Sequence, residues 1–467
     1  MRWRLTTSSG EGATRRLSAN KPPSWNILDR KFERAYVVNV MIRVVFSAIL
    51  ALWSFTVKAQ VQMLWKSGVS NVTCMESAVD SKGNVVVGGF SRTAVTSGIP
   101  FIMKFDPLGN KLWELQLATN SASGIDDLAI DQHDRIILSA RLTPDPFEDP
   151  RPVSLIQISP GGLELWRRTE NFAPGSGSDY TSFSAIKVDS QNNIFMCWLQ
   201  FSNYSRLAAA RYTEDGLRLW YRVLPADGYV VDRGEMSRFM SLTYDGGFVF
   251  AGKRVILSDG FNQAATNFLI RLDSRGRTEW QVIGQDLPDL STLAVDRFNR
   301  LCVAVGEGVS LFNLRSGRHR FLTKGLEASD VLTSTPDGGF LMLRGNDLIK
   351  LNGEGHQIWS VNTGLSSSFL GVVSDGAGGW IAAGKKFNIA RPDMNLVFVG
   401  IANNGGLRWQ ASLNGFPFQD QSLFWRNLQA IYRAPDGSLR VVVNETSRNG
   451  PYTEIIGIGV YSFAINR

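Results

Sequence analysis

The sequence predicts an all-β protein: an eight-bladed β-propeller of four-stranded antiparallel blades, with seven blades as the alternative count. Three observations predict it: a hairpin pattern that recurs eight times, a second hairpin that recurs in step with it, and the composition. The chain of 467 residues has 45 glycines and 11% aromatic residues, and Val, Ile, Thr, Phe and Trp recur in short runs. Such runs, separated by Gly, Asn and Asp, are typical of strands joined by tight turns.

The first hairpin is clearest in segment 76–90, which reads ESAVD-SKGN-VVVGGF. Two β-rich runs flank a turn made of residues that tolerate positive φ. Seven further copies follow at spacings of 39–59 residues, which is typical of a repeat architecture. The second strands of the eight copies begin at Val85, Ile136, Ile194, Phe248, Leu301, Phe340, Trp380 and Leu439.

The second hairpin, which reads FIMKFD-PLGN-KLWELQL in the first copy, carries a Trp in its outer strand in most copies. We expect each Trp to fill the widening gap between radially arranged blades, where its burial contributes about 3 kcal/mol or more. The fifth copy, VSLFNLRSGRHRFLT, has Phe321 near that place instead. The residues with this expected structural role are Trp65, Trp113, Trp166, Trp220, Trp280, Trp359 and Trp409.

The two ends of the repeat region complement each other. The eighth copy ends at IGIGVYSFAINR without an outer Trp strand, whereas segment 61–67 has the outer-strand pattern and contains Trp65. We therefore expect segment 61–67 to pair with segment 455–465 and complete the last blade, which removes an open sheet edge. Each blade has two apolar faces that only its neighbours can bury, so the copies are expected to close into a ring.

The chain divides into three parts. Residues 41–59 have the layout of a signal peptide: Arg43, an apolar run of about 14 residues, and small or aliphatic residues before Gln60. The run is shorter than the roughly 20 residues that span a bilayer, so a retained anchor is the alternative interpretation. Residues 1–40 are interpreted as a disordered leader or as sequence upstream of a true start at Met41. Residues 60–467 form the single predicted propeller domain.

The formal net charge of +7 arises entirely within the first 59 residues, because residues 60–467 hold equal numbers of basic and acidic side chains. A neutral body excludes the electrostatic footprint of a nucleic-acid-binding protein. We expect an exported monomer that is periplasmic, cell-surface or secreted, without a stable membrane span after cleavage.

The repeat resembles known propeller families. The pairing of D-x-x-G-N-h-h-h-G-G with h-h-K-h-D-x-x-G-x-x-x-W, where h is hydrophobic, looks like that of bacterial β-propeller repeat proteins. It is also similar to the repeats of the quinoprotein-dehydrogenase-like (PQQ-like) superfamily. The resemblance covers roughly residues 61–467 and is specific for architecture, not function. Quinone enzymes of that superfamily use adjacent cysteines, whereas Cys74, Cys197 and Cys302 lie far apart and are expected to be buried small hydrophobes. No cofactor is therefore expected.

Long connections on one face of the disc are the predicted binding site. The hairpin turns lie on one side of an up-and-down blade, and the longer, variable connections lie on the other. Function usually sits on variable loops held by a rigid frame. The alternative is that the aromatic residues of these connections pack beneath the loops. The predicted binding residues are Phe147, Tyr180, Tyr229, Phe416, Phe418 and Trp425.

No catalytic or metal-binding set is predicted. The three histidines fall in or near different turns, and the repeated Asp80, Asp131, Asp189 and Asp296 are expected to cap turns rather than bind calcium. The predicted function is an exported, non-catalytic binding or scaffolding module for protein or glycan partners. The alternative is a lyase or hydrolase acting on an extracellular polymer. Carboxylates with a Tyr or His at the central axis would favour the enzyme, whereas small residues there, as the inner strands suggest, would favour binding.

Overall fold

The computed structural model describes strands and turns of one compact unit, Lys58–Arg467. Within the described ranges, no helix is long and apolar enough to cross a membrane. The described ranges are 60–91, 98–117, 124–142, 152–170, 180–201, 205–224, 229–230, 239–258, 262–284, 287, 290–305, 308–324, 331–364, 369–387, 394–413, 428–449 and 452–466.

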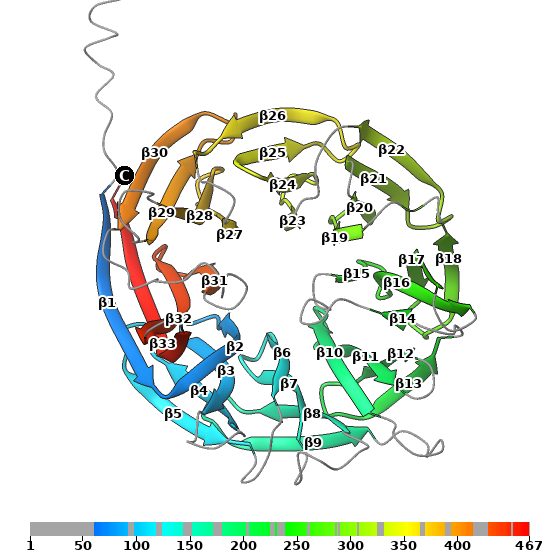
Figure 1. The fold of residues 1–467 in the computed structure, drawn as a ribbon, viewed down its shortest axis with the longest axis horizontal. Coiled ribbons are helices and arrows are strands. Elements are labelled where there is room, and N and C mark those ends of the chain that lie inside the picture. The colour runs from blue at the N-terminus through cyan, green and yellow to red at the C-terminus, as the bar shows by residue number, and fades with distance from the viewer. Residues whose placement is uncertain are drawn as a thin grey trace, which may run out of the picture. The chain divides into compact units, whose positions relative to one another are not determined.

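Eight antiparallel sheets stand around a central axis (Figure 1). The first strand of each sheet is innermost except in the fourth, where the short second strand is innermost. Blades 1 and 2 are β2 (Val72–Val79), β3 (Val85–Ser91), β4 (Ile99–Phe105) and β5 (Lys111–Gln116), then β6 (Ile125–Ile130), β7 (Ile136–Arg141), β8 (Val153–Ile158) and β9 (Glu164–Glu170). Blades 3 and 4 are β10 (Tyr180–Val188), β11 (Ile194–Phe201), β12 (Ser205–Tyr212) and β13 (Arg218–Val223), then β14 (Tyr229–Val230), β15 (Met240–Leu242), β16 (Phe248–Ser258), β17 (Asn262–Leu272) and β18 (Thr278–Gly284).

The second half of the ring repeats the same order. Blades 5 and 6 are β19 (Leu290–Val295), β20 (Arg300–Val305), β21 (Gly308–Asn313) and β22 (His319–Lys324), then β23 (Val331–Ser334), β24 (Phe340–Arg344), β25 (Asp347–Leu351) and β26 (Gln357–Asn362). Blades 7 and 8 are β27 (Phe369–Ser374), β28 (Trp380–Phe387), β29 (Met394–Ile401) and β30 (Leu407–Leu413), then β31 (Leu428–Arg433), β32 (Leu439–Asn449), β33 (Tyr452–Asn466) and β1 (Gln60–Ser70). The predicted count of eight blades is confirmed.

Blade 8 closes the ring with strands from both ends of the unit. Strand β1 pairs antiparallel with β33, so that Val61 lies opposite Ile465 and Trp65 opposite Ser462. The predicted closure is confirmed, and β1 extends beyond the predicted segment 61–67 at both ends. In Figure 1, β1 forms the outer edge of the blade that holds β31, β32 and β33.

Blade 4 departs from the predicted loop lengths. Segment 254–267 was expected as a long connection, but its described residues, 254–258 and 262–267, form the ends of β16 and β17. These strands pair from Phe248 opposite Leu272 to Ser258 opposite Asn262. Continued antiparallel pairing satisfies backbone groups that a loop would leave to solvent. The inner edge of this blade is split, because β14 and the three-residue strand β15 both pair with β16.

Apolar residues fill the space between adjacent blades. One cluster joins Phe195 of blade 3 with Phe248 of blade 4 and Leu301 of blade 5, and all three are fully buried. The three cysteines are free and buried, as the sequence predicted. Burial raises the pKa of the Cys197 thiol to about 12, which keeps it protonated at neutral pH.

Six outer-strand Trp residues bind the next blade. Each indole Nε1–H donates to a backbone carbonyl in the next blade, that of the second residue in the turn between its third and fourth strands, at 2.5–3.1 Å. Each ring also lies against the glycine of that turn, as Trp113 does against Gly162. The pairs are Trp65–Pro107, Trp113–Pro160, Trp166–Glu214, Trp220–Ser274, Trp280–Leu314 and Trp359–Asn403.

The joints between blades 7 and 8 and between blades 5 and 6 lack this Trp hydrogen bond, for two separate reasons. Trp409 contacts Gly400 of its own blade, since β33 and β1 are not joined by a turn that could receive its indole. In blade 5 the outer-strand position that Trp occupies in other blades is taken by Arg320, which pairs with Leu311. The Arg320 Nη2 donates to the Glu354 carbonyl of blade 6 at 3.0 Å. Phe321 lies one residue further along, opposite Ser310. Phe321 is therefore adjacent to the Trp position, as expected, and Arg320 occupies the position itself.

The four inner turns predicted to be capped by Asp80, Asp131, Asp189 and Asp296 are capped in that way. In blade 1 the Asp80 carboxylate accepts the backbone N–H groups of Lys82 and Asn84, both at 2.9 Å. Gly83, the fourth turn residue, has φ +82°, a conformation that favours Gly, Asn and Asp. Each of the eight inner hairpins also pairs a turn carboxylate with a cation. The pairs are Asp80–Lys104, Asp131–Arg135, Asp189–Arg211, Asp245–Arg271, Asp296–Arg300, Asp337–Lys350, Asp375–Arg408 and Asp436–Arg440.

Candidate functional site

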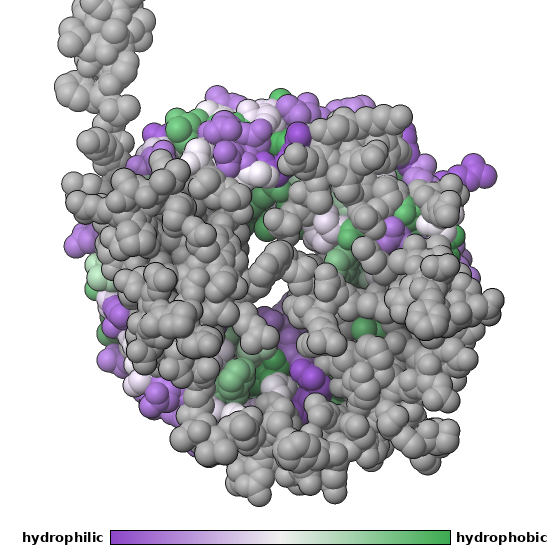
Figure 2. All heavy atoms as spheres, viewed as in Figure 1, coloured by the Kyte–Doolittle hydropathy of each residue, from purple (hydrophilic) through white to green (hydrophobic). Residues whose placement is uncertain are grey.

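The predicted loop-face residues are not brought together by the described structure. Phe147, Phe416, Phe418 and Trp425 lie outside the described residues. Tyr180 begins β10 opposite Phe201, and Tyr229 begins β14 opposite Arg254, but only their backbones are described. Binding by this face therefore stays a prediction. Figure 2 shows an opening near the middle of the ring, with hydrophobic and hydrophilic described residues around it.

The opposite face carries the hairpin turns, and we call it the turn face. Three joints between neighbouring blades have the same hydrogen bond there, which we call a turn bridge. The backbone N–H of the second inner-turn residue of one blade donates to the side chain of the fourth inner-turn residue of the next blade. The bridges are Ser81 to Asp134 (2.8 Å), Gln132 to Asn192 (3.0 Å) and Tyr244 to Asn299 (2.6 Å).

The acceptor of a turn bridge must be a side chain on a left-handed backbone. Asp134, Asn192 and Asn299 have φ of +57° to +61°, and Asp and Asn are the non-glycine residues that adopt this conformation most readily. They tie blade 1 to 2, blade 2 to 3 and blade 4 to 5. The joint between blades 3 and 4 lies between these bridged joints but has Gly246 at the acceptor position, so the bond cannot form.

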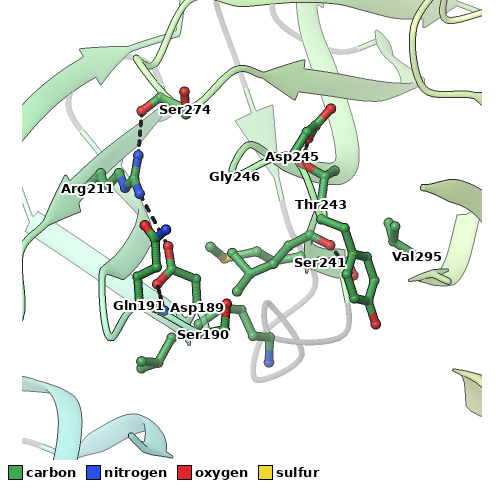
Figure 3. A pocket seen from close by; sticks show the side chains of 15 residues that line it. Asp189, Ser190, Gln191, Arg211, Ser241, Thr243, Asp245, Gly246, Ser274 and Val295 are labelled. Atoms are coloured by element: carbon green, nitrogen blue, oxygen red, sulfur yellow. Dashed lines mark hydrogen bonds and ion pairs between the residues drawn. The ribbon is translucent and has the colours of Figure 1, made fainter. Parts of the chain in front are cut away.

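A cavity of roughly 720 Å³ opens at the joint between blades 3 and 4. That volume lies within the range of small-molecule sites. Figure 3 shows Asp189, Gln191 and Arg211 on the blade 3 side facing Thr243 and Asp245 on the blade 4 side. The glycine at the bridge position and the short strand β15 account for the opening.

Glycine at the bridge position does not open a cavity of this size at every joint. Between blades 5 and 6 the Phe298 ring lies against Gly338, and Arg300 donates to the Gly338 carbonyl. Between blades 8 and 1, Pro435 packs on Gly83. A smaller cavity of about 410 Å³ lies between blades 7 and 8. At the joint between blades 3 and 4, polar Gln191 stands at the turn position that Phe298 occupies in blade 5, and no aromatic ring lies against Gly246.

The blade 3 wall of the cavity is rigid. Arg211 donates from Nη1 to the Ser274 carbonyl at 2.9 Å and from Nη2 to the Asp189 carboxylate at 3.3 Å. Its guanidinium also lies over the Phe195 ring, 4.9 Å from the centroid. Asp189 in turn accepts the Gln191 backbone N–H at 2.8 Å, so the wall is organised without a ligand.

The blade 4 wall is also held in place. The Asp245 carboxylate accepts the Thr243 hydroxyl at 2.5 Å and pairs with Arg271. Burial alone would raise the pKa of Asp245, but the Thr243 hydroxyl and the Arg271 charge outweigh burial, and the pKa lies below its ordinary value. Tyr244 is 66% exposed, and its backbone N–H is fixed by the bridge to Asn299.

Polar groups on the innermost strands join blades 2 and 3. Asp126 pairs with Arg141 at 2.8 Å and accepts the Ser184 hydroxyl at 2.9 Å across the joint. Asp127 accepts the Ile186 backbone N–H at 2.9 Å. Burial raises the pKa of Asp126, although the Arg141 charge opposes it.

Tyr432 serves the joint between blades 8 and 1. Its hydroxyl hydrogen-bonds to the backbone carbonyl of Ser77 and lies 3.2 Å from the Ser77 hydroxyl. Burial raises the pKa of the Tyr432 phenol. The inner strands thus carry carboxylates and a tyrosine, where the sequence suggested small residues. These groups bond to the neighbouring blade, which is a structural role. Tyr432 and Asp126 lie at different joints.

The closed ring of eight sheets, seven with four strands and one with five, makes this chain an eight-bladed β-propeller protein. No family model matches the chain, and no curated protein sequence matches it. The resemblance to the quinoprotein-dehydrogenase-like superfamily therefore stays a prediction.

Several solved structures are similar in fold. One is a protein of unknown function from Bacteroides caccae, with 15% identity over 59% of this chain and 93% of that chain, and a TM-score of 0.33. Another is the WD40 domain of SCAP from fission yeast, with 10% identity over 88% of this chain and 98% of that chain, and a TM-score of 0.45. At these values the likenesses say nothing about a ligand, and the fold assignment rests on the strand order.

The sequence analysis missed the cavity between blades 3 and 4. An alignment of the eight inner turns contains the signal, because their fourth residues are Gly, Asp, Asn, Gly, Asn, Gly, Gly and Gly in chain order. This fourth turn position is informative only once it is known that its side chain reaches the preceding blade. Only the packed ring shows that contact.

Proposed function

We propose that the protein is an exported, non-catalytic binding module whose rigid ring presents a ligand site to partners outside the cytoplasm. The observation that carries the proposal is the contrast on the turn face. Polar turn residues close the joints on either side of the one between blades 3 and 4, whereas that joint keeps a preformed polar cavity. Clefts of this size with convergent polar groups are the default binding-site hypothesis in an uncharacterised fold.

Export is supported by the layout of residues 41–59, with a short basic start, an apolar run and a small residue before Gln60. The test is to express the full chain with its own leader and a C-terminal tag, then fractionate the cells and sequence the N-terminus. We expect an exported protein that begins at Gln60. A full-length protein retained in the cytoplasm would contradict the proposal.

Binding is tested on the same exported protein. We expect it to retain defined glycans on an array, or to capture a specific exported protein, above the level of a heat-unfolded sample. The enzyme alternative predicts shortened polysaccharide products instead. Release of such products at a rate abolished by unfolding would overturn the non-catalytic assignment.

A further inference from the structure

We propose that the cavity between blades 3 and 4 is a saccharide-binding subsite that takes one uncharged sugar residue. The inference rests on the proposed function and deepens it by naming the site and the class of ligand. The site lies on the turn face, opposite the loops on which the sequence predicted binding. All the residues that line it are described.

The charge of the cavity favours a neutral ligand. Two carboxylates, Asp189 and Asp245, and two cations, Lys187 and Arg211, line it, so their formal charges cancel. The carboxylates are already paired, Asp189 with Arg211 and Asp245 with Arg271. An anion or a cation would have to disrupt these pairs, and a buried charge left without its partner is costly.

The polar groups suit a ligand with many hydroxyls. A sugar hydroxyl both donates and accepts, so it is best served by an acceptor and a donor placed side by side. The Asp189 carboxylate and the Arg211 guanidinium provide that combination 3.3 Å apart, and the Gln191 amide stands beside them. Ser241 and Thr243 add hydroxyls on the opposite wall.

An aromatic surface completes the site. Tyr244 lines the cavity and is 66% exposed, while its backbone is held by the bridge to Asn299. A phenol ring offers a flat apolar face with a polar end, which matches the C–H face and hydroxyl rim of a pyranose. Leu242 and Val295 add further apolar surface.

The site is formed before any ligand arrives. Arg211 has three partners, the Asp189 carboxylate, the Ser274 carbonyl and the Phe195 ring. A side chain already fixed in place loses little conformational entropy when a ligand binds, which favours affinity.

Gly246→Asn tests the site directly. At φ +83° asparagine is tolerated, and the nearest atom to its Cβ is the Ser274 Cβ at an ordinary contact of 3.5 Å. By the geometry of Asn192 and Asn299, the new side chain would accept the Ser190 backbone N–H and cross the mouth of the cavity. The matched control is Gly378→Asn, at the same turn position in blade 7, where nothing lies within 4 Å of the added Cβ.

The experiment measures binding of the exported full chain to methyl glycosides of glucose, galactose, mannose and N-acetylglucosamine by titration calorimetry. Glucuronate and inorganic phosphate are the charged comparisons. We expect at least one neutral glycoside to bind, about tenfold or more weaker binding in Gly246→Asn and in Gln191→Ala, and unchanged binding in Gly378→Asn. Gln191 is exposed, so its variant keeps the test valid if Gly246→Asn does not fold.

Three results would overturn the inference. Glycoside binding unchanged in both Gly246→Asn and Gln191→Ala would move the site elsewhere and leave the proposed binding function standing. Tighter binding of glucuronate or phosphate, or of a protein partner at this cavity, would reject the neutral-sugar assignment. An exported protein that binds no glycan and no protein partner would reject the proposed function itself.

Discussion

The joint between blades 2 and 3 and the joint between blades 3 and 4 share one blade but are closed to different degrees. The first has a turn bridge from Gln132 to Asn192 and the buried carboxylate Asp126 at its inner strands. The second has Gly246 at the bridge position and a cavity of roughly 720 Å³. Both joints share the apolar packing and the outer hydrogen bond from Trp166 or Trp220. The difference teaches that side chains at a few inner-turn positions decide which joints are also bridged on the turn face.

Removal of the Asp126 carboxylate from its inner strand is expected to have the largest effect on stability. Asp126→Ala removes the carboxylate that pairs with Arg141, whose side chain is 21% exposed, and removes a bond to Ser184. We expect a loss of about 3–5 kcal/mol in the free energy of unfolding. Urea denaturation of the variant and the wild type measures it. A loss below about 1 kcal/mol would show that the Asp126 carboxylate contributes little to this joint.

The capped inner turn of blade 1 gives the next effect, and it depends on pH. Burial would raise the pKa of Asp80, but the bonds from Lys104 and Asn84 outweigh it and lower the pKa below the ordinary value. The stabilisation is therefore present above the unfolded pKa and is lost as pH falls through the lower folded value.

Asp80→Asn is expected to cost about 1.5–3 kcal/mol at pH 7, as expected for hydrogen bonds to a charged group. The cost should shrink below about pH 4, where the carboxyl begins to protonate in the unfolded chain. Denaturant midpoints from pH 7 to pH 3 check it. A difference between variant and wild type that is constant with pH would contradict the paired, ionised state of Asp80.

The turn bridge itself is expected to have a smaller effect. Asn192→Gly keeps the left-handed backbone at φ +61° and removes a side chain that accepts from the Gln132 backbone N–H and also bonds to His133 and Glu214. We expect a loss of about 0.5–1.5 kcal/mol, the usual net contribution of a hydrogen bond. Chemical denaturation measures the loss, and slower or unchanged amide exchange at Gln132 would argue against the bridge.

The reverse change at the open joint has the smallest expected effect. Gly246→Asn adds a bridge, and we expect a gain of about 0.5 kcal/mol in the free energy of unfolding, with slower amide exchange at Ser190. Thermal denaturation and hydrogen exchange check it. A clear destabilisation would show that blade 4 cannot accept the geometry of its neighbours.

Much of the fold followed from the sequence because its signals are local or periodic. The alternation of short β-rich runs with Gly, Asn and Asp turns predicted the eight blades, and the missing outer strand predicted the pairing of β1 with β33. Strand ends were less predictable. Segment 254–267 has no sequence feature that distinguishes a long loop from the extended hairpin of β16 and β17.

The candidate site was not predictable in the same way. Asp189, Arg211 and Asp245 each read as a turn or strand residue within one blade, and their shared cavity exists only because blades 3 and 4 pack side by side. Similarly, the register of β22, and with it the place of Arg320 where other blades have Trp, depends on pairing with β21.

The amino-acid sequence by itself determined the repeat, the number of blades, the aspartate-capped turns and the closure of the ring. Hydrophobic periodicity and turn chemistry act over a few residues, so they can be recognised without coordinates. Tertiary structure alone decided which joints are bridged, which joint has the cavity of roughly 720 Å³ and which side chains meet there. These are contacts between residues tens of positions apart, and their existence depends on how neighbouring sheets pack around the axis.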